Sequence, residues 1–158
     1  MNPPLSAAAL RVFSKVLADF AFLFGDAVAP EELPVLEGRG YLACLPFRGG
    51  LEGSVAVVVS EGLAVEMAAN MLGREPGDPE AVRGAQDAVR ELASVIGGQL
   101  VTALAEPGLD VEFSPPVLFV LEDADWQRLR QDPQTQCFDV NALPAMLRVV
   151  VNREGAPA

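Results

Sequence analysis

The stretch Asp87-Ala-Val-Arg-Glu-Leu-Ala-Ser-Val-Ile-Gly-Gly-Gln99 lies within the longest helical pattern of the chain, at about residues 79–105. Apolar side chains recur there every three or four residues and would face a core: Ala88, Val89, Leu92, Ile96, Leu100 and Ala103. A second, narrow arc of the same helix, the polar stripe, consists of Asp87, Glu91, Ser94 and Gly98. The spacing predicts a long central helix on which the other elements pack.

Two features of this helix oppose simple helix formation. Asp87 and Glu91 are like charges at i,i+4, which costs a few tenths of a kcal/mol. Gly97 and Gly98 each cost up to ~1 kcal/mol relative to Ala in a helix interior. Two interpretations stay open from chemistry alone. The stripe is a solvated face with a glycine pair where another element packs closely, or it presents a carboxylate and a hydroxyl beside a glycine that lets a partner approach.

Composition limits the class of protein. The chain has 158 residues, 51% of them apolar, which is enough for one domain with a core. The net charge of −11, without any cluster of Lys and Arg, argues against a nucleic-acid binder. No apolar run reaches the ~18 residues of a membrane span. Asp19 and Asp26 flank the apolar segment at residues 20–24, which is not typical of a signal peptide. We therefore expect a cytoplasmic protein without a membrane segment.

The chain contains no histidine, which excludes a Ser-His-Asp triad and histidine metal sites. Cys44 and Cys137 are far apart, and two thiols alone do not make a zinc site. Each falls in a predicted strand, which indicates buried free thiols. The acidic cluster at residues 122–125 lacks the spacing and the glycine of a calcium loop, and no phosphate loop, dinucleotide fingerprint or nucleophile elbow is present. No metal site is predicted.

Before the long helix, the pattern predicts a helix at residues 6–24, capped by Ser6, stopped by Gly25 and with these residues inward: Leu10, Phe13, Leu17, Phe20 and Phe24. Residues 26–40 read as a loop with a short extended piece at residues 35–36. Strands at residues 41–47 and 51–60 form a hairpin, the second of them central, and Pro46 indicates an edge position or a strand end.

A shorter helix is predicted at residues 62–73, with Leu63, Met67, Met71 and Leu72 inward and with Glu66 and Asn70 on a solvated surface. Asp78 is the expected cap of the long helix, with Pro79 as its first residue. The pair Pro107-Gly108 is expected to end that helix.

After the long helix, residues 111–113 and 117–121 are predicted to be extended, with a break at Ser114-Pro115-Pro116. Residues 122–133 form a polar loop or a short helical turn, in which Trp126 either contacts a partner or packs over the core. The last strands are residues 134–140 and 145–151. Because strands come in adjacent pairs, we predict an α+β fold with a mostly antiparallel sheet and helices packed on it.

The polar stripe and its surroundings resemble the CheC/CheX/FliY family of bacterial chemotaxis phosphatases, and CheX-like domains most of all. The family motif is an acidic residue or Ser, three positions, Glu, two positions, Asn and, further on, a Pro. Asp87 and Glu91 match it, Pro116 lies one residue short of the nominal spacing of about twenty-two positions, and Ser94 stands in place of the Asn. Similar segments are Gly53-Ser54-Val55 and the helix that ends in Asn70-Met71-Leu72-Gly73. The resemblance covers about residues 5–152 and implies one CheX-like domain over residues 1–158.

The resemblance implies hydrolysis of the aspartyl-phosphate on the receiver domain of a response regulator. In that scheme Glu91 pairs with a lysine of the receiver, and the residue at position 94 orients the attacking water. The remaining residues of the site would contact the receiver: Asp87, Gly97, Gly98 and Pro116. The receiver would supply the phosphoryl group and Mg²⁺, so the chain needs no cofactor of its own.

Ser94 is the departure from the motif, because a hydroxyl is shorter than a carboxamide. Three functions therefore stay open: a phosphatase of weak activity, a degenerate module that binds a receiver or another signalling partner without hydrolysis, and a scaffold domain without a receiver partner. The resemblance also implies a homodimer, for which the last strand, at residues 145–151, is the expected contact.

Overall fold

The computed structural model describes residues 3–104, 108 and 110–152. The elements follow in this order: α1 (Pro3–Ala21), β1 (Gly25–Val28), the 3-10 turn η1 (Pro30–Glu32), β2 (Gly40–Gly49), β3 (Glu52–Ser60), α2 (Glu61–Leu72), α3 (Pro79–Leu104), β4 (Val111–Phe113), β5 (Val117–Leu121), α4 (Asp123–Gln131), β6 (Thr135–Val140) and β7 (Leu143–Asn152).

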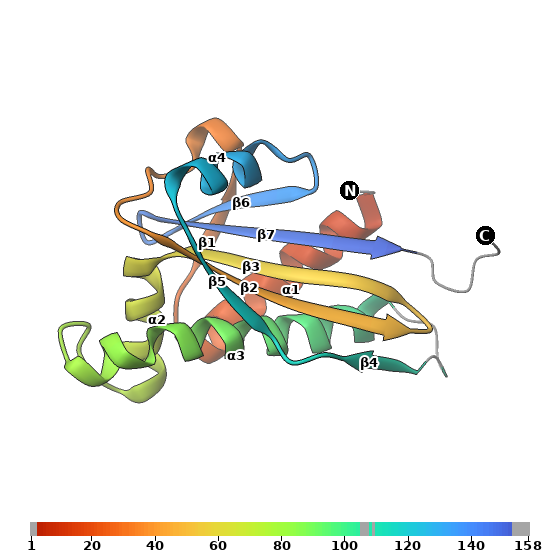
Figure 1. Ribbon diagram of the computed structural model, residues 1–158, viewed down its shortest axis with the longest axis horizontal. Helices are drawn as coiled ribbons and strands as arrows, with labels where there is room; N and C mark the ends of the chain where they lie inside the picture. Colours follow the sequence, from red (N-terminus) through yellow and green to blue (C-terminus); the bar gives the residue numbers. More distant parts are fainter. Residues whose placement is uncertain (1–2, 105–107, 109, 153–158) are drawn as a thin grey trace.

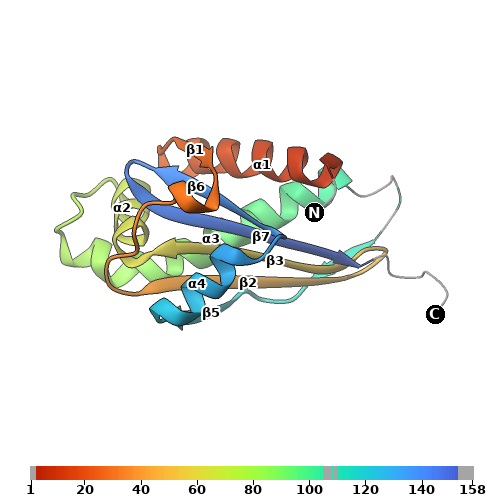
Figure 2. The same cartoon turned by 90° about the horizontal axis from the view of Figure 1, so that it is seen from above.

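In the described part of the chain, seven strands form one antiparallel sheet in the order β1-β6-β7-β3-β2, and β4 and β5 both pair with the far edge of β2. Helices α1 and α3 lie side by side on one face, α2 lies at one end of them, and α4 lies on the opposite face (Figures 1 and 2). The α+β prediction is confirmed. Within the described residues, no helix is both long and apolar enough to cross a membrane.

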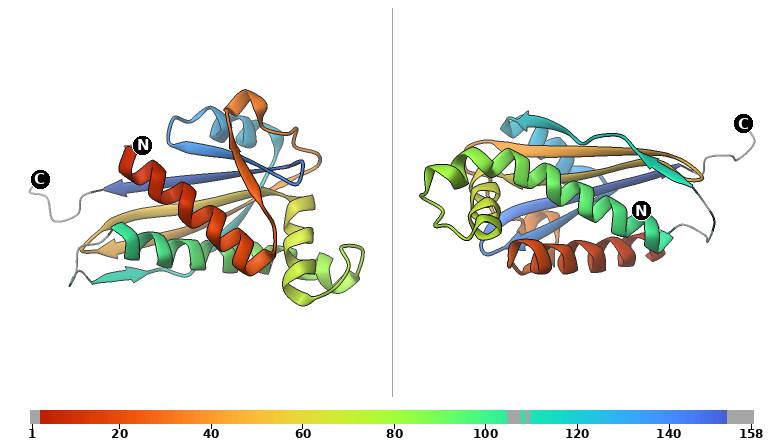
Figure 3. Two further views of the ribbon diagram at one scale, coloured as in Figure 1. Left: turned by 180° about the vertical axis from the view of Figure 1, so that it is seen from behind. Right: turned by 90° about the horizontal axis from the view of Figure 1, so that it is seen from below.

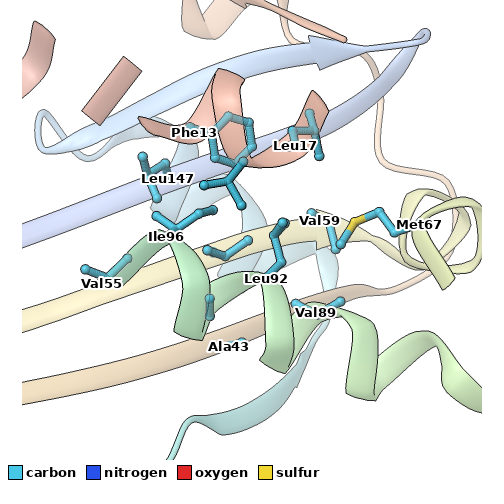
Figure 4. Packing of buried hydrophobic residues seen from close by; sticks show 14 of the residues in the cluster. Phe13, Leu17, Ala43, Val55, Val59, Met67, Val89, Leu92, Ile96 and Leu147 are labelled. Carbon is cyan, nitrogen blue, oxygen red and sulfur yellow. The ribbon is translucent and has the colours of Figure 1, made fainter. Parts of the chain in front are cut away.

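The main core lies between the sheet and the layer of α1 and α3. Phe13 and Leu17 of α1 point toward Leu147 of β7 and Ile96 of α3 (Figure 4). Phe13 also stacks on Phe138, with ring centroids 4.2 Å apart. Each fully buried side chain of this size contributes about 1.5–3 kcal/mol, so α3 is held firmly against the sheet.

A smaller core lies on the other face, under α4. Trp126 is 1% exposed and packs with Val58, Met146 and Cys137. Val57 and Val58 are neighbours on β3 but belong to different cores, so β3 is covered on both faces, as predicted. Trp126 is therefore a core residue. Of the two interpretations of Trp126, packing over the core is correct and contact with a partner is not. The segment that carries it is the short helix α4 and not a loop.

Helix α1 differs from its prediction at both ends. It begins at Pro3, so Ser6 lies inside the helix and does not cap it. It ends at Ala21, where Phe22 takes a left-handed conformation (φ 55°). Phe24 consequently lies beyond the helix and is 80% exposed, and Phe20, inside the helix, is 40% exposed, so neither is buried as predicted.

Gly25 starts β1, a strand that the loop prediction missed. This strand has only four residues and no apolar alternation, and it pairs with the distant residues 137–140 of β6. Residues 35–36, in contrast, form no strand.

Pro46 is not at a sheet edge. Strand β5 pairs with residues 40–44 of β2 and β4 pairs with residues 47–49, so Pro46 lies opposite the Ser114–Pro116 break between them. The Pro46 carbonyl accepts a hydrogen bond from the Ser114 N–H at 3.0 Å. A proline is tolerated inside β2 because the neighbouring strand is interrupted at the same level.

Strand β7 is not exposed either. Its residues pair with β3 over Ala145–Asn152 and with β6 over Leu143–Arg148. The expectation of an exposed strand at residues 145–151 is therefore wrong over residues 145–148, which pair on both sides, and only residues 149–151 keep one free side. The free edges of the sheet are β1 on one side and β4 and β5 on the other.

Three smaller predictions also need correction. The Asn70 side chain donates a hydrogen bond to the Ala21 carbonyl at 2.8 Å, so Asn70 is not simply solvated, and Glu66 is half-buried. Leu72 is 53% exposed, because it lies at the last residue of α2. Ala103 is exposed near the end of α3. Pro107, the predicted stop of that helix, lies outside the described residues.

Candidate functional site

Helix α3 is a fixed platform for the polar stripe. Its N-terminus is capped as predicted: the Asp78 carboxylate accepts from the Glu80 N–H at 2.8 Å, and Pro79 is the first helical residue. The inward face is buried along the length of the helix, through Val89, Leu92 and Ile96. The opposite face is left for contacts with other molecules (Figure 3, right).

The side chains of Asp87, Glu91 and Ser94 are all exposed on that outer face. Asp87 accepts a hydrogen bond from Arg90 at 2.7 Å, and its own side chain is 84% exposed. Glu91 and Ser94 have no side-chain hydrogen bond or ion pair to any described residue. The two lie about one turn apart, roughly 5 Å along the helix axis. The stripe therefore offers an unengaged carboxylate beside an unengaged hydroxyl.

The two glycines have different surroundings. Gly97 is buried, and a Cβ there would collide with the Leu45 side chain of β2. This glycine lets α3 approach its own sheet, which corrects the expectation that it admits a partner. A Cβ at Gly98 would meet nothing within 4 Å, and the Gly98 carbonyl accepts from the Thr102 hydroxyl at 2.9 Å. Gly98 alone leaves open space on the outer face.

The segment from β4 to β5 borders α3 (Figure 1). Pro116 is half-buried there, between the two strands. Phe113 is 40% exposed, lies 6.0 Å from the Phe47 ring between centroids, and would touch a side chain built at Gly97. The structure thus brings an exposed aromatic ring next to Gly97 of α3. The sequence pattern did not select Phe113, because its place depends on the pairing of β4 with Phe47.

Other polar clusters have structural roles. Glu61 accepts from the Tyr41 hydroxyl at 2.7 Å and from Arg39 at 2.6 Å, and these bonds, that from Tyr41 first, lower the pKa of Glu61. They tie the start of α2 to β2. Burial raises the pKa of both cysteine thiols, Cys137 buried and Cys44 half-buried, so both are poor nucleophiles.

The chemistry available at the stripe is limited and specific. The Ser94 hydroxyl has no hydrogen bond to a base among the described residues, so none of them activates it as a nucleophile. In the part of the chain that the structure describes, no three His, Cys, Asp or Glu side chains are grouped to hold a metal ion. A carboxylate can pair with a cation of a partner, and a hydroxyl can hold a water by donating and accepting hydrogen bonds. The arrangement suits recognition of a partner and positioning of a water.

The family model described as chemotaxis phosphatase CheX matches residues 41–138. No curated protein matches the chain. Among solved structures, CheX of Desulfovibrio desulfuricans has a TM-score of 0.68 at 17% identity, over 94% of this chain and 99% of that one. CheX of Vibrio vulnificus has a TM-score of 0.66 at 21% identity, over 96% and 100%. A CheX–CheY–BeF3–Mg²⁺ complex from Borrelia burgdorferi contains a chain with a TM-score of 0.62 at 16% identity, over 93% and 97%.

Proposed function

Because the chain belongs to the CheX family of chemotaxis phosphatases, we propose that the polar stripe of α3 binds the receiver domain of a response regulator and promotes hydrolysis of its aspartyl-phosphate. The observation that carries the proposal is that Glu91 and Ser94 are exposed and that their side chains have no hydrogen bond or ion pair to any described residue. Both lie on α3, a helix whose opposite face is buried in the core. The complex of the Borrelia CheX with CheY supports a receiver as the partner. With such a partner, we expect the protein to act in the cytoplasm.

Each residue of the stripe has a role in this proposal. Glu91 pairs with a lysine of the receiver, and Asp87 reaches the receiver by exchanging its exposed bond to Arg90, which is worth no more than about 1 kcal/mol. Gly98 leaves room for the receiver backbone. Phe113 and Pro116 supply an apolar flank to the docking surface.

Hydrolysis requires one water in line with the bond that breaks. The water oxygen bonds to phosphorus, the bond from phosphorus to the receiver aspartate breaks, and the products are a carboxylate and orthophosphate. Ser94 holds that water. Mg²⁺ bound by the receiver would neutralise charge on the phosphoryl oxygens, and this chain supplies no ligand to it.

Ser94 also limits the rate. A hydroxyl reaches less far than a carboxamide, and a displacement of about 1 Å can cost ~10²-fold in rate. The second candidate function follows from the same residue: a module that docks the receiver and does not hydrolyse the phosphate. Both functions use the same surface, so a mutation at position 94 separates them.

The test measures the decay of phosphorylated receiver domains from the same organism, alone and with each variant. We expect wild type to shorten the lifetime of the phosphorylated receiver and Glu91→Ala to leave that lifetime unchanged. Ser94→Asn should increase the rate of dephosphorylation by ~10–100-fold over wild type. Glu80→Ala is the matched control, because Glu80 is an exposed carboxylate three turns earlier on α3 and should behave as wild type.

Isothermal titration calorimetry of the chain with the same receivers measures binding separately from hydrolysis. Binding without hydrolysis, together with a gain of activity in Ser94→Asn, would identify the non-catalytic module. If no receiver binds and none decays faster with any variant, both candidate functions are wrong.

We also propose a homodimer, with β5 as its contact in place of β7. Strand β5 is a free edge of the sheet and has no charged residue among its five, in a chain of net charge −11. Two copies would meet there with the least repulsion.

A further inference from the structure

Three phenylalanines at the end of α1 are held out into solvent. Phe20, Phe22 and Phe24 are 40%, 66% and 80% exposed, whereas Ala21 and Leu23 between them are buried. The alternation shows that the backbone is anchored from the inside while the three rings point outward. We call Phe20, Phe22 and Phe24 the phenylalanine patch. Exposed apolar side chains that gather in this way mark interaction sites more often than isolated ones do.

The conformation of Phe22 is costly and is maintained by its neighbours. Its φ of 55° is left-handed, at the helix end where glycine is the usual residue. The Phe22 N–H donates to the Ala18 carbonyl at 3.2 Å, and the Asn70 side chain donates to the Ala21 carbonyl at 2.8 Å. The fold therefore keeps an exposed aromatic ring where a residue without a side chain would be easier to accommodate. Strain of this kind concentrates at functional sites.

The charge around the phenylalanine patch is mostly negative. Residues 16–38 contain no Lys or Arg, and they contain these acidic residues: Asp19, Asp26, Glu31, Glu32 and Glu37. Asp19 pairs with Lys15 at the surface, and Asp26 is exposed on β1, directly after the patch. A second copy of this acidic surface, or an anionic membrane, would be repelled, and a cationic partner would be attracted.

We propose that the phenylalanine patch is a docking site for a basic amphipathic helix of another protein. Apolar side chains of that helix pack on the three rings, and its Lys and Arg side chains face Asp19 and Asp26. A helix satisfies its own backbone hydrogen bonds and needs only side-chain contacts, whereas an added strand would find just four residues of β1 to pair with. The patch lies where α1 ends and β1 begins, beside α2 (Figure 3, left). The site uses no residue of the polar stripe, so the inference does not depend on the receiver proposal.

The test uses a fluorescein-labelled amphipathic helical peptide of leucine and lysine, titrated with the full chain and followed by anisotropy. A leucine and glutamate peptide of the same pattern tests the charge. The variant Phe20→Ser/Phe22→Ser/Phe24→Ser removes the patch. The matched control, Val35→Ser/Leu72→Ser/Val82→Ser, removes three other exposed apolar side chains, which are 82%, 53% and 57% exposed.

We expect wild type and the control to bind the lysine peptide, and the patch variant to bind it at least about tenfold more weakly. The glutamate peptide should not bind. Equal loss in the patch variant and the control, or equal binding of both peptides, would overturn the proposal. Circular dichroism checks folding, and Phe24→Ser alone, at the most exposed of the three positions, serves if the triple variant does not fold. The decay of phosphorylated receiver should be unchanged in the patch variant.

Discussion

At the scale of single residues, the two adjacent glycines of α3 make opposite contributions. Gly97 is buried against Leu45, and a side chain there must displace Leu45, which is itself only 2% exposed. Gly98 faces open space, where glycine only weakens the helix. Packing thus requires a glycine at position 97 but not at position 98.

We therefore predict opposite effects of the same substitution. Gly97→Ala should destabilise the fold by about 1–3 kcal/mol, because the core is overpacked. Gly98→Ala should stabilise it by about 0.5–1 kcal/mol through helix propensity. Urea denaturation of both variants beside wild type measures the two changes. A stabilising Gly97→Ala would mean that Leu45 moves aside freely and that the close packing of α3 on β2 is not needed.

The residues of the candidate site show what helical periodicity can predict. The 100° spacing placed Asp87, Glu91 and Ser94 on one outer face, and all three are exposed. The same spacing contains no information on the surroundings of Gly97, because its neighbour Leu45 is distant in sequence, on β2. Whether Glu91 and Ser94 act on a receiver stays a prediction for the hydrolysis experiment.

At the scale of elements, the start of α2 is tied to β2 by a carboxylate. Glu61 accepts hydrogen bonds from Tyr41 and Arg39, and these hold the pKa of Glu61 below its ordinary value. A lowered pKa in the folded state means that the stabilisation is fully present above the ordinary carboxyl pKa of about 4.3. It is lost as the pH falls through the lowered pKa of the folded protein.

Glu61→Gln should therefore be less stable than wild type at neutral pH, and the difference should shrink as the pH falls below about 4. The measurement is the midpoint of urea denaturation at a series of pH values for both proteins. Glu75→Gln is the control, because Glu75 is exposed and its side chain has no partner in the described part of the chain. A difference that is the same at neutral and at acid pH would show that the carboxylate charge plays no part in this tie.

Elements with strong local patterns were predicted, and those that depend on distant partners were not. Helix α3, its Asp78 cap and the β2–β3 hairpin follow from periodicity and turn residues. Strand β1 has no pattern of its own and exists because β6 pairs with it. Pro46 indicates an edge position or a strand end when β2 is considered alone, because the coinciding break at Ser114–Pro116 lies in a distant part of the sequence.

At the scale of the whole molecule, the order of the strands in the sheet is the property that the sequence could not supply. Adjacent strands predicted an antiparallel α+β fold correctly, but the pairing of Val55 with Val149 joins the two halves of the chain and moves β7 to the centre. This leaves β1 and the β4–β5 pair as edges. The edge of β1 is protected by its shortness and by Asp26, whereas β5 has neither protection against pairing with another strand, because it is longer and uncharged.

The proposed dimer should therefore be sensitive to charge on β5 and insensitive to charge on β1. We expect wild type to elute as a dimer in size-exclusion chromatography with light scattering. Phe119→Lys should be monomeric with unchanged circular dichroism, because Phe119 is 52% exposed and a lysine on an edge strand opposes pairing with a second copy. Ala27→Lys, on the exposed part of β1 at the opposite edge, should remain dimeric. A monomeric wild type would show that the homodimer proposal is wrong. If Ala27→Lys is monomeric and Phe119→Lys is still a dimer, the contact lies on β1 and not on β5.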